Sequence, residues 1–234
     1  MQPVNQQGHG QERMKIGEAL ARMVHRSRFV LWGVLAVIVV LFLGYFVWNE
    51  IDKKWTYDST VLAEGAQELS QKWSAEQEAE KKAALESDLV DQLSKLISRY
   101  PRQYGGQRGL LLRADMSLAK KAWDDAREDY EDLAKRFPRS YLAPIALFNA
   151  AVCLEEKGER NAAQALYLKV AGSYKDAPVA PRALFGAGRI DEENEAFAEA
   201  GKRYDQLASE YPASDWTKLG KNRIIALKVL GKLN

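Results

Sequence analysis

The chain has 234 residues, of which 47% are hydrophobic and 28% are charged, and its formal net charge is +2. These proportions are ordinary for a globular domain, so they exclude a wholly disordered chain and one embedded entirely in a membrane. Residues 49–234 hold 29 basic and 30 acidic side chains, and this balance argues against nucleic-acid binding, which needs clustered positive charge.

Residues 1–28 form a basic tail. Residues 1–12 are polar and rich in Gln and Gly, a composition that predicts disorder. From Met14 to Arg28 the apolar residues fall on one helical face among basic residues. Two interpretations stay open: an amphipathic helix on an anionic membrane surface, or the ordinary basic flank of an anchor, which we favour.

Residues 29–48 form an unbroken apolar run. The run reads FVLWGVLAVIVVLFLGYFVW and contains no charge. As a helix it is about 30 Å long, the thickness of a bilayer core. It exceeds the apolar region of a signal peptide and no small-residue cleavage site follows it. We therefore predict an uncleaved transmembrane helix that contacts the lipid bilayer.

The charges beside this run predict its orientation. Lys53 and Lys54 follow it but are offset by Glu50 and Asp52. Because positive residues stay on the cytoplasmic side, the amino terminus is expected inside and residues 49–234 outside. The basic residues before the run are Arg13, Lys15, Arg22, Arg26 and Arg28.

Residues 49–106 are expected to form a stalk and a first helical pair. No Gly or Pro occurs between Gly44 and Gly65, so the anchor helix is expected to continue for several turns beyond the membrane. The pair is predicted at 57–75 and 77–99. In the second of these helices, strong helix formers carry opposite charges at close spacing.

Four aromatic residues recur at an interval of 37 positions. In all four units the positions 4, 7 and 11 before the aromatic are apolar or aromatic, and these offsets follow one face of a helix. Such a register predicts a tandem array of helical repeats. The aromatic residues are Tyr100, Phe137, Tyr174 and Tyr211, and a proline follows three of them directly, as Pro101, Pro138 and Pro212.

Residues 107–234 are predicted to alternate first and second helices. Pro144 and Pro181 stand in first turns, where a missing N–H costs nothing. Ser140 and Ser214 are candidate caps, and Gly158 separates the two helices of its unit. The expected first helices are 107–120, 144–157, 181–192 and 215–231, and the expected second helices are 122–136, 159–173 and 196–210. The fold class is therefore all-α.

These units resemble the tetratricopeptide-repeat family. We number each unit from residues 107, 144 and 181. The family has a small residue at position 8, Ala at 20, an aromatic at 24 and Pro at 32. This chain has the same residue types at these positions, except that Lys175 replaces one proline. The repeat length also differs from that of the family, at 37 residues instead of 34. The matching residues are Ala114, Ala151 and Gly188; Ala126, Ala163 and Ala200; Tyr130, Tyr167 and Tyr204; and Pro138 and Pro212.

The resemblance implies a protein-binding solenoid. A single amino-terminal anchor followed by such repeats resembles the ancillary subunit of the SecYEG translocon. That likeness implies a bacterial inner-membrane protein with its repeats in the periplasm, contacting translocon components or periplasmic chaperones. The alternative is a structural protein of the envelope that associates with itself as a homo-oligomer.

No catalytic or cofactor-binding constellation is recognised. His9 and His25 both precede the anchor, so residues 49–234 lack the usual base and metal ligand. Tyr104-Gly105-Gly106 is predicted to be a turn rather than a phosphate loop. We expect no enzyme activity, no catalytic residue, no cofactor and no metal.

Other candidate groups are better explained structurally. Asp124-Asp125 and Glu192-Glu193 are adjacent, so their members point apart on a helix and are expected to be solvated. Cys153 lies among apolar residues and is predicted to be a buried small hydrophobe rather than a reactive thiol.

The candidate partner-binding residues lie on the first helices, at positions that face the concave surface in the family. For Phe148 and Phe185 the alternative is packing between neighbouring helices, which we favour slightly. The helix predicted at 215–231 is more apolar than an outer cap needs, which leaves capping and docking both open. The candidates are Arg108, Leu111, Phe148, Val152, Arg182, Phe185 and Arg189.

Overall fold

The computed structural model describes the backbone of residues 8–233 and the side chains of residues 29–30 and 32–233. The predicted disorder of residues 1–7 lies outside this range, and residues 8–12 belong to a helix instead. The chain divides into two units, one ending at Lys54 and one beginning at Trp55.

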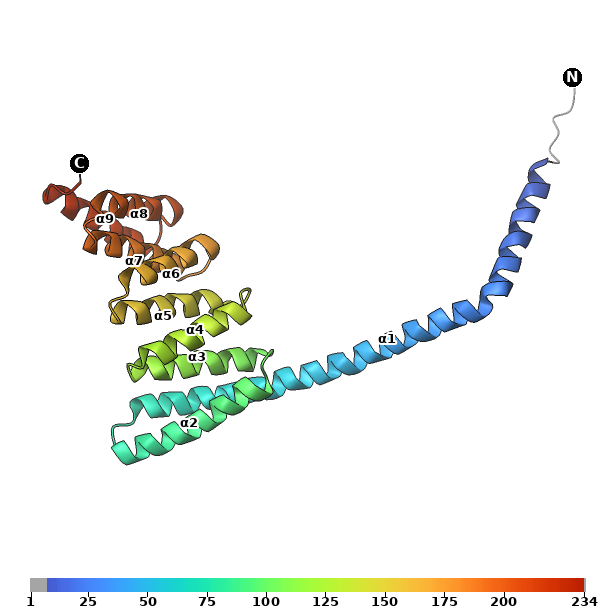
Figure 1. Cartoon of the computed structure of the whole chain (residues 1–234), viewed down its shortest axis with the longest axis horizontal. Helices are drawn as coiled ribbons and strands as arrows, with labels where there is room; N and C mark the ends of the chain where they lie inside the picture. Colours follow the sequence, from blue (N-terminus) through green and yellow to red (C-terminus); the bar gives the residue numbers. More distant parts are fainter. Residues whose placement is uncertain (1–7, 234) are drawn as a thin grey trace, which may run out of the picture. The chain divides into compact units, whose positions relative to one another are not determined.

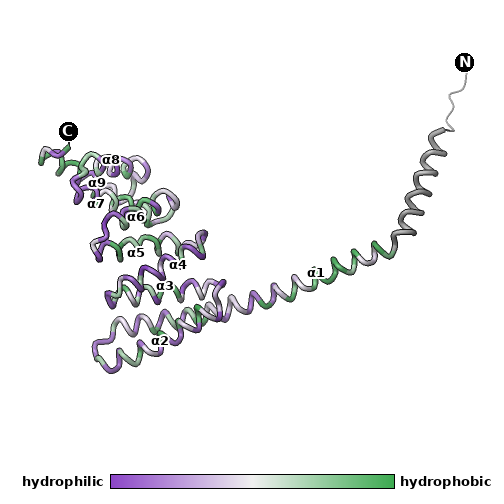
Figure 2. Tube along the Cα trace, viewed as in Figure 1, coloured by the Kyte–Doolittle hydropathy of each residue, from purple (hydrophilic) through white to green (hydrophobic). Residues whose placement is uncertain are grey.

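The first unit contains most of the longest helix, α1 (Gly8–Ala75), which continues into the second unit. From Trp32 onward α1 includes an 18-residue window of mean hydropathy 2.2, none of which is buried. Figure 2 shows this stretch as the hydrophobic part of α1. A long apolar helix without cover is compatible with a single membrane span.

The second unit is an array of helical hairpins (Figure 1). The predicted helical pairs are confirmed, with boundaries shifted by at most three residues, except that the helix expected to begin at 57 is continuous with α1. The end of α1 pairs with α2 (Ala79–Arg99); the further hairpins are α3 (Tyr104–Ala119) with α4 (Trp123–Arg136), α5 (Leu142–Glu156) with α6 (Arg160–Ser173), and α7 (Ala180–Glu193) with α8 (Phe197–Glu210), followed by α9 (Asp215–Val229).

The turns of the α3–α4, α5–α6 and α7–α8 hairpins each contain one residue in the left-handed region. Lys121, Gly158 and Glu195 have φ values of 60°, 81° and 59°. They are 37 residues apart, so the same turn conformation recurs in each repeat, even where the residue has a Cβ that disfavours a positive φ. Only Gly158 adopts this conformation without steric cost.

The periodic aromatic residues repeat their environment. Each of the four ends a second helix, and its N–H bonds to the carbonyl four residues earlier. The Tyr174 hydroxyl donates to the Pro138 carbonyl at 3.1 Å, and the Tyr211 hydroxyl donates to the Lys175 carbonyl at 3.1 Å. Each of these two hydroxyls therefore links its repeat to the loop that ends the preceding repeat.

Phe137 has no hydroxyl, and its neighbour provides the equivalent bond. The Arg136 guanidinium donates to the Pro101 carbonyl at 3.1 Å. The same junction is thus made by a different side chain.

The core consists of the helical faces that the periodicity predicts. Ala126, Tyr130 and Leu133 of α4 are fully buried, and so are Ala200 and Tyr204 of α8. A separate apolar cluster joins the end of α1 to α2 and α3. It contains Ala63, Ala66, Trp73, Leu89, Leu93, Leu96, Tyr100, Leu112 and Met116.

The prediction of a turn at Gly105-Gly106 is wrong, because both residues lie in the first turn of α3. A Cβ at Gly105 would lie 2.3 Å from the Ser59 carbonyl oxygen, and one at Gly106 would lie 2.1 Å from the Tyr100 carbonyl oxygen. The glycines therefore permit close packing of α3 on α1 and on the end of α2.

The prediction for Cys153 is confirmed. Its side chain is buried in the core that α5 shares with α4 and α6. Burial raises the pKa of its thiol to about 11, so the thiolate is scarce at neutral pH.

Candidate functional site

Five of the seven candidate residues line one cavity of ≈ 200 Å³. They come from two first helices, α5 and α7. The cavity is completed by Trp216 of α9, Tyr167 of α6, and Glu155 and Gly186. The candidates in it are Phe148, Val152, Arg182, Phe185 and Arg189.

Arg182 is stacked between two aromatic rings. Its guanidinium carbon lies 4.6 Å from the centroid of Phe148 and 5.5 Å from that of Trp216. Cation–π contacts of this kind hold the guanidinium beside the rings without using its N–H groups as donors to a carboxylate. The side chain is exposed, and no carboxylate of the described residues pairs with it. The cavity rim therefore carries an oriented donor group without an acceptor.

Phe148 and Phe185 differ in their burial. Phe148 is 5% exposed and packs on the Tyr167 ring at 5.2 Å, so it is chiefly a core residue. Phe185 is half-buried between Tyr204 and Trp216, at centroid distances of 5.6 Å and 5.4 Å. The two rings form the apolar floor of the cavity.

Arg189 is held by carboxylates. It donates to Glu155 at 2.5 Å and to Glu193 at 2.6 Å, and Glu155 also accepts from the Tyr167 hydroxyl at 2.6 Å. Burial is the main cause that raises the pKa of Tyr167, so the hydroxyl remains a donor. Arg189 is thus part of the cavity wall rather than a free cation like Arg182.

The other two candidates lie outside this cavity. Leu111 is 6% exposed and belongs to the core. Arg108 donates to Gln67 of α1 and lines a different cavity, between α1 and α3, of ≈ 470 Å³.

A pair of tyrosines connects α3 with the start of α5. Tyr104 also lines the α1–α3 cavity, and its ring stacks on Tyr141 at a centroid distance of 6.0 Å. Tyr141 directly precedes α5, the helix that carries Phe148. We call the surface formed by α1, α3, α5, α7 and α9 around these residues the first-helix face.

The acidic pairs differ from expectation in one respect. Glu192 is not solvated, because its side chain is 8% exposed and accepts from the Tyr204 hydroxyl at 2.5 Å and from Arg223. Asp124 is exposed and accepts from Lys157 at 2.6 Å. Within the described part of the chain, no group of three or more metal-ligating side chains occurs.

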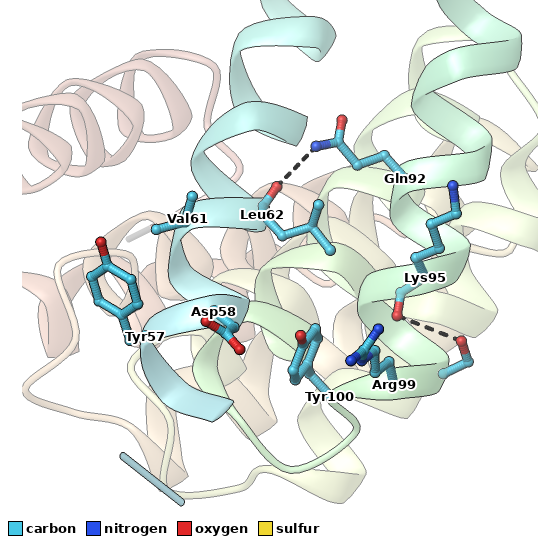
Figure 3. Close-up of a pocket in the computed structure, with 9 residues that line it drawn as sticks. Tyr57, Asp58, Val61, Leu62, Gln92, Lys95, Arg99 and Tyr100 are labelled. Atoms are coloured by element: carbon cyan, nitrogen blue, oxygen red, sulfur yellow. Dashed lines mark hydrogen bonds between the residues drawn. The ribbon is translucent and has the colours of Figure 1, made fainter. Parts of the chain in front are cut away.

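A larger cavity was not anticipated from the sequence. It measures ≈ 730 Å³ and lies between α1 and α2 (Figure 3). Gln92 bridges its two walls by donating to the Leu62 carbonyl at 3.3 Å. The other lining residues are Tyr57, Asp58, Val61, Lys95, Ser98, Arg99 and Tyr100.

Comparison with known proteins agrees with the repeat geometry. Residues 108–140 and 145–177 each match the family model described as tetratricopeptide repeat. These two segments of the chain are therefore tetratricopeptide repeats. Tetratricopeptide repeats are protein-interaction modules and are in general not enzymes, so the repeats of this chain are an interaction scaffold.

A curated relative carries the same type of repeat. The chain is 41% identical over 118 residues to a "TPR repeat-containing protein" of Treponema pallidum (strain Nichols). The match covers 50% of this chain and 49% of the relative. This chain therefore spans about half the length of that protein.

Proposed function

We propose that the tetratricopeptide-repeat protein is a membrane-anchored adaptor that binds another protein along its first-helix face. The observation that carries this proposal is the stacked, unpaired Arg182 beside an apolar cavity. Arginine and aromatic side chains in partly enclosed sites are the usual anchors of protein interfaces. A cavity of ≈ 200 Å³ has room for one apolar side chain of a bound segment.

The chemistry of the site indicates what the bound segment carries. The exposed edge of Arg182 suits a carboxylate, which accepts two parallel N–H bonds from a guanidinium. The neighbouring rings of Phe148 and Phe185 suit an apolar side chain. A segment with an acidic residue next to a large apolar one satisfies both requirements.

Membrane anchoring is supported by residues 29–48. This run has no charge, and none of the described side chains in it is buried by the rest of the protein. The preceding basic residues support a cytoplasmic amino terminus by the positive-inside tendency. We therefore propose a cytoplasmic tail at 1–28, a span at 29–48, a stalk and first helical pair at 49–106, and repeats at 107–234 outside the cytoplasm.

The proposed location is the bacterial inner membrane, with the repeats in the periplasm. The bacterial relative and the arrangement of one anchor before repeats support this location. Confinement to the membrane plane raises the effective concentration of an adaptor near membrane-bound partners. Translocon components and periplasmic chaperones are the partners that we propose.

The binding proposal is tested by affinity capture from detergent-solubilised membranes with the full chain as bait. A partner should be captured by the wild type and lost with Arg182→Ala. Arg139→Ala is the matched control, because Arg139 is exposed in the loop before α5. Equal capture by both variants would contradict the assignment of Arg182. Capture of further copies of this chain alone would favour the structural homo-oligomer.

Topology has its own test. In intact spheroplasts, added protease should digest the repeats, whereas the tail should survive until the membrane is opened. Repeats that resist digestion until lysis would place them in the cytoplasm and contradict the proposed orientation.

A further inference from the structure

The side of each first helix that meets its own second helix is covered in the hairpins but bare in α9. In α7, Leu184 is 1% exposed, and a Cβ at Gly188 would lie 2.8 Å from the Tyr204 ring of α8. The residues 37 positions later are Lys221 and Ile225 of α9. Both are exposed, and 60% of Ile225 is accessible. Among the described residues no helix occupies this position.

The bare side of α9 combines apolar and basic residues. Ile225 and Val229 are one helical turn apart, and Val229 is 82% exposed. Lys221 and Lys228 lie on the same side by helical spacing. No described carboxylate pairs with either lysine. We call the surface formed by Lys221, Ile225, Lys228 and Val229 the open seat.

The described residues after α9, which end at Leu233, do not cover the open seat. Gly231 has a φ of 67° and turns the chain. Lys232 then lies over the Phe197 ring of α8 at 4.3 Å, and a Cβ at Gly201 of α8 would meet Leu233 at 3.2 Å. These residues therefore pack against α8, leaving the open seat exposed.

The residue types at the open seat indicate what would fill it. In α3, α5 and α7 the position equivalent to Lys221 is a buried leucine. These residues are Leu110, Leu147 and Leu184. A purely solvated cap has no need of two exposed β-branched side chains. An apolar stripe beside unpaired lysines instead complements a helix with an apolar face and acidic borders.

We propose that the open seat binds an acidic amphipathic helix of a partner protein, which completes a fifth hairpin with α9. The occupant would be about as long as the second helices, which have 14 residues in α4, α6 and α8. This inference depends on α9 alone and is independent of the cavity at Arg182.

The protein supplies a matched pair of probes. The α4 segment, WDDAREDYEDLAKR, carries six acidic and three basic residues. The α6 segment, RNAAQALYLKVAGS, carries two basic residues and no acidic one. Both place a small residue, a tyrosine and an aliphatic residue at equivalent buried positions. The two peptides differ chiefly in charge.

The test measures binding of each helix-stapled, fluorescent peptide to the full chain in neutral-lipid nanodiscs. The α4 peptide should bind at least ten times more tightly than the α6 peptide. The paired change Lys221→Glu with Lys228→Glu should abolish that preference. Lys169→Glu with Lys202→Glu changes the net charge equally at exposed sites on α6 and α8 and should preserve it.

Three results would overturn the proposal. Equal affinity for the two peptides would show that the seat does not select charge. If the wild type sediments as a dimer and the Ile225→Glu variant sediments as a monomer, a second copy of the chain covers α9. Loss of α4-peptide binding in anionic-lipid nanodiscs, but not in neutral ones, would assign the surface to lipid.

Discussion

The Tyr204 hydroxyl of α8 donates a hydrogen bond of 2.5 Å to Glu192 of α7, and the same carboxylate accepts from Arg223 of α9 at 3.0 Å. One buried carboxylate therefore joins three consecutive helices. Burial alone would raise the pKa of Glu192, but the hydrogen bonds from Arg223 and Tyr204 hold it below the usual 4.5. The junction is stabilised by the ionised form.

This junction predicts an acid-sensitive carboxyl-terminal end. A depressed pKa contributes stability that is present above the unfolded value near 4.5 and is lost as the pH falls through the folded pKa. Glu192→Gln should lower the free energy of unfolding at pH 7 by about 1–3 kcal/mol. The deficit should shrink as the pH falls below 4.5. Urea unfolding monitored by circular dichroism at both pH values measures it, and a deficit unchanged by pH would contradict the ionic contribution.

Asp115 provides a comparison of opposite sign. Burial raises its pKa, although the Tyr130 hydroxyl donates to it at 2.6 Å. Its ionised form is therefore penalised in the fold, and stability is lost as the pH rises from the unfolded pKa through the folded one. The free energy of unfolding of Asp115→Asn, relative to that of the wild type, should be higher at pH 7 than at pH 3.5. The reverse order in urea unfolding would show that the Tyr130 bond dominates.

The left-handed turn residues predict two stabilising substitutions. Lys121 and Glu195 adopt φ values of 60° and 59°, which cost about 1–2 kcal/mol for a residue with a Cβ. After the greater unfolded-state entropy of glycine is subtracted, Lys121→Gly and Glu195→Gly should each raise the free energy of unfolding by about 0.5–1 kcal/mol. Gly158→Ala should lower it by a similar amount. A loss of stability on introducing either glycine would contradict the strain.

Two glycines predict opposite responses to the same substitution. A Cβ at Gly105 would meet the Ser59 backbone, whereas a Cβ at Gly172 of α6 would have no neighbour within 4 Å. Gly105→Ala should therefore destabilise the packing of α3 on α1 by about 1–3 kcal/mol. Gly172→Ala should stabilise α6 by about 0.5–1 kcal/mol. Thermal unfolding of both variants is the measurement, and equal effects would indicate that the close contact at Ser59 relaxes freely.

The hairpins were predictable because one 37-residue register controls both burial and turns. The same register led to five residues of the first-helix face that share a cavity. It missed Trp216, which is not at one of the inward positions considered, although its ring covers Arg182.

Other features depend on contacts between segments that share no motif. The cavity between α1 and α2 joins Tyr57 and Arg99, which are far apart in sequence. Gly105 predicts a turn because glycine often marks turns, and only the proximity of Ser59 reveals its packing role. Glu192 was expected in solvent because periodicity does not show that α9 brings Arg223 to it.

The central claim is that the first-helix face, and not the outer side of the second helices, contacts the partner. The direct measurement is photocrosslinking in living cells, with a photoreactive residue at Tyr141, which is 64% exposed beside α5, or at the exposed Lys169 on α6. A crosslink to another protein from position 141, absent from 169 and lost with Arg182→Ala, is the predicted result. The same protein captured from position 169 but not from 141 would contradict the account.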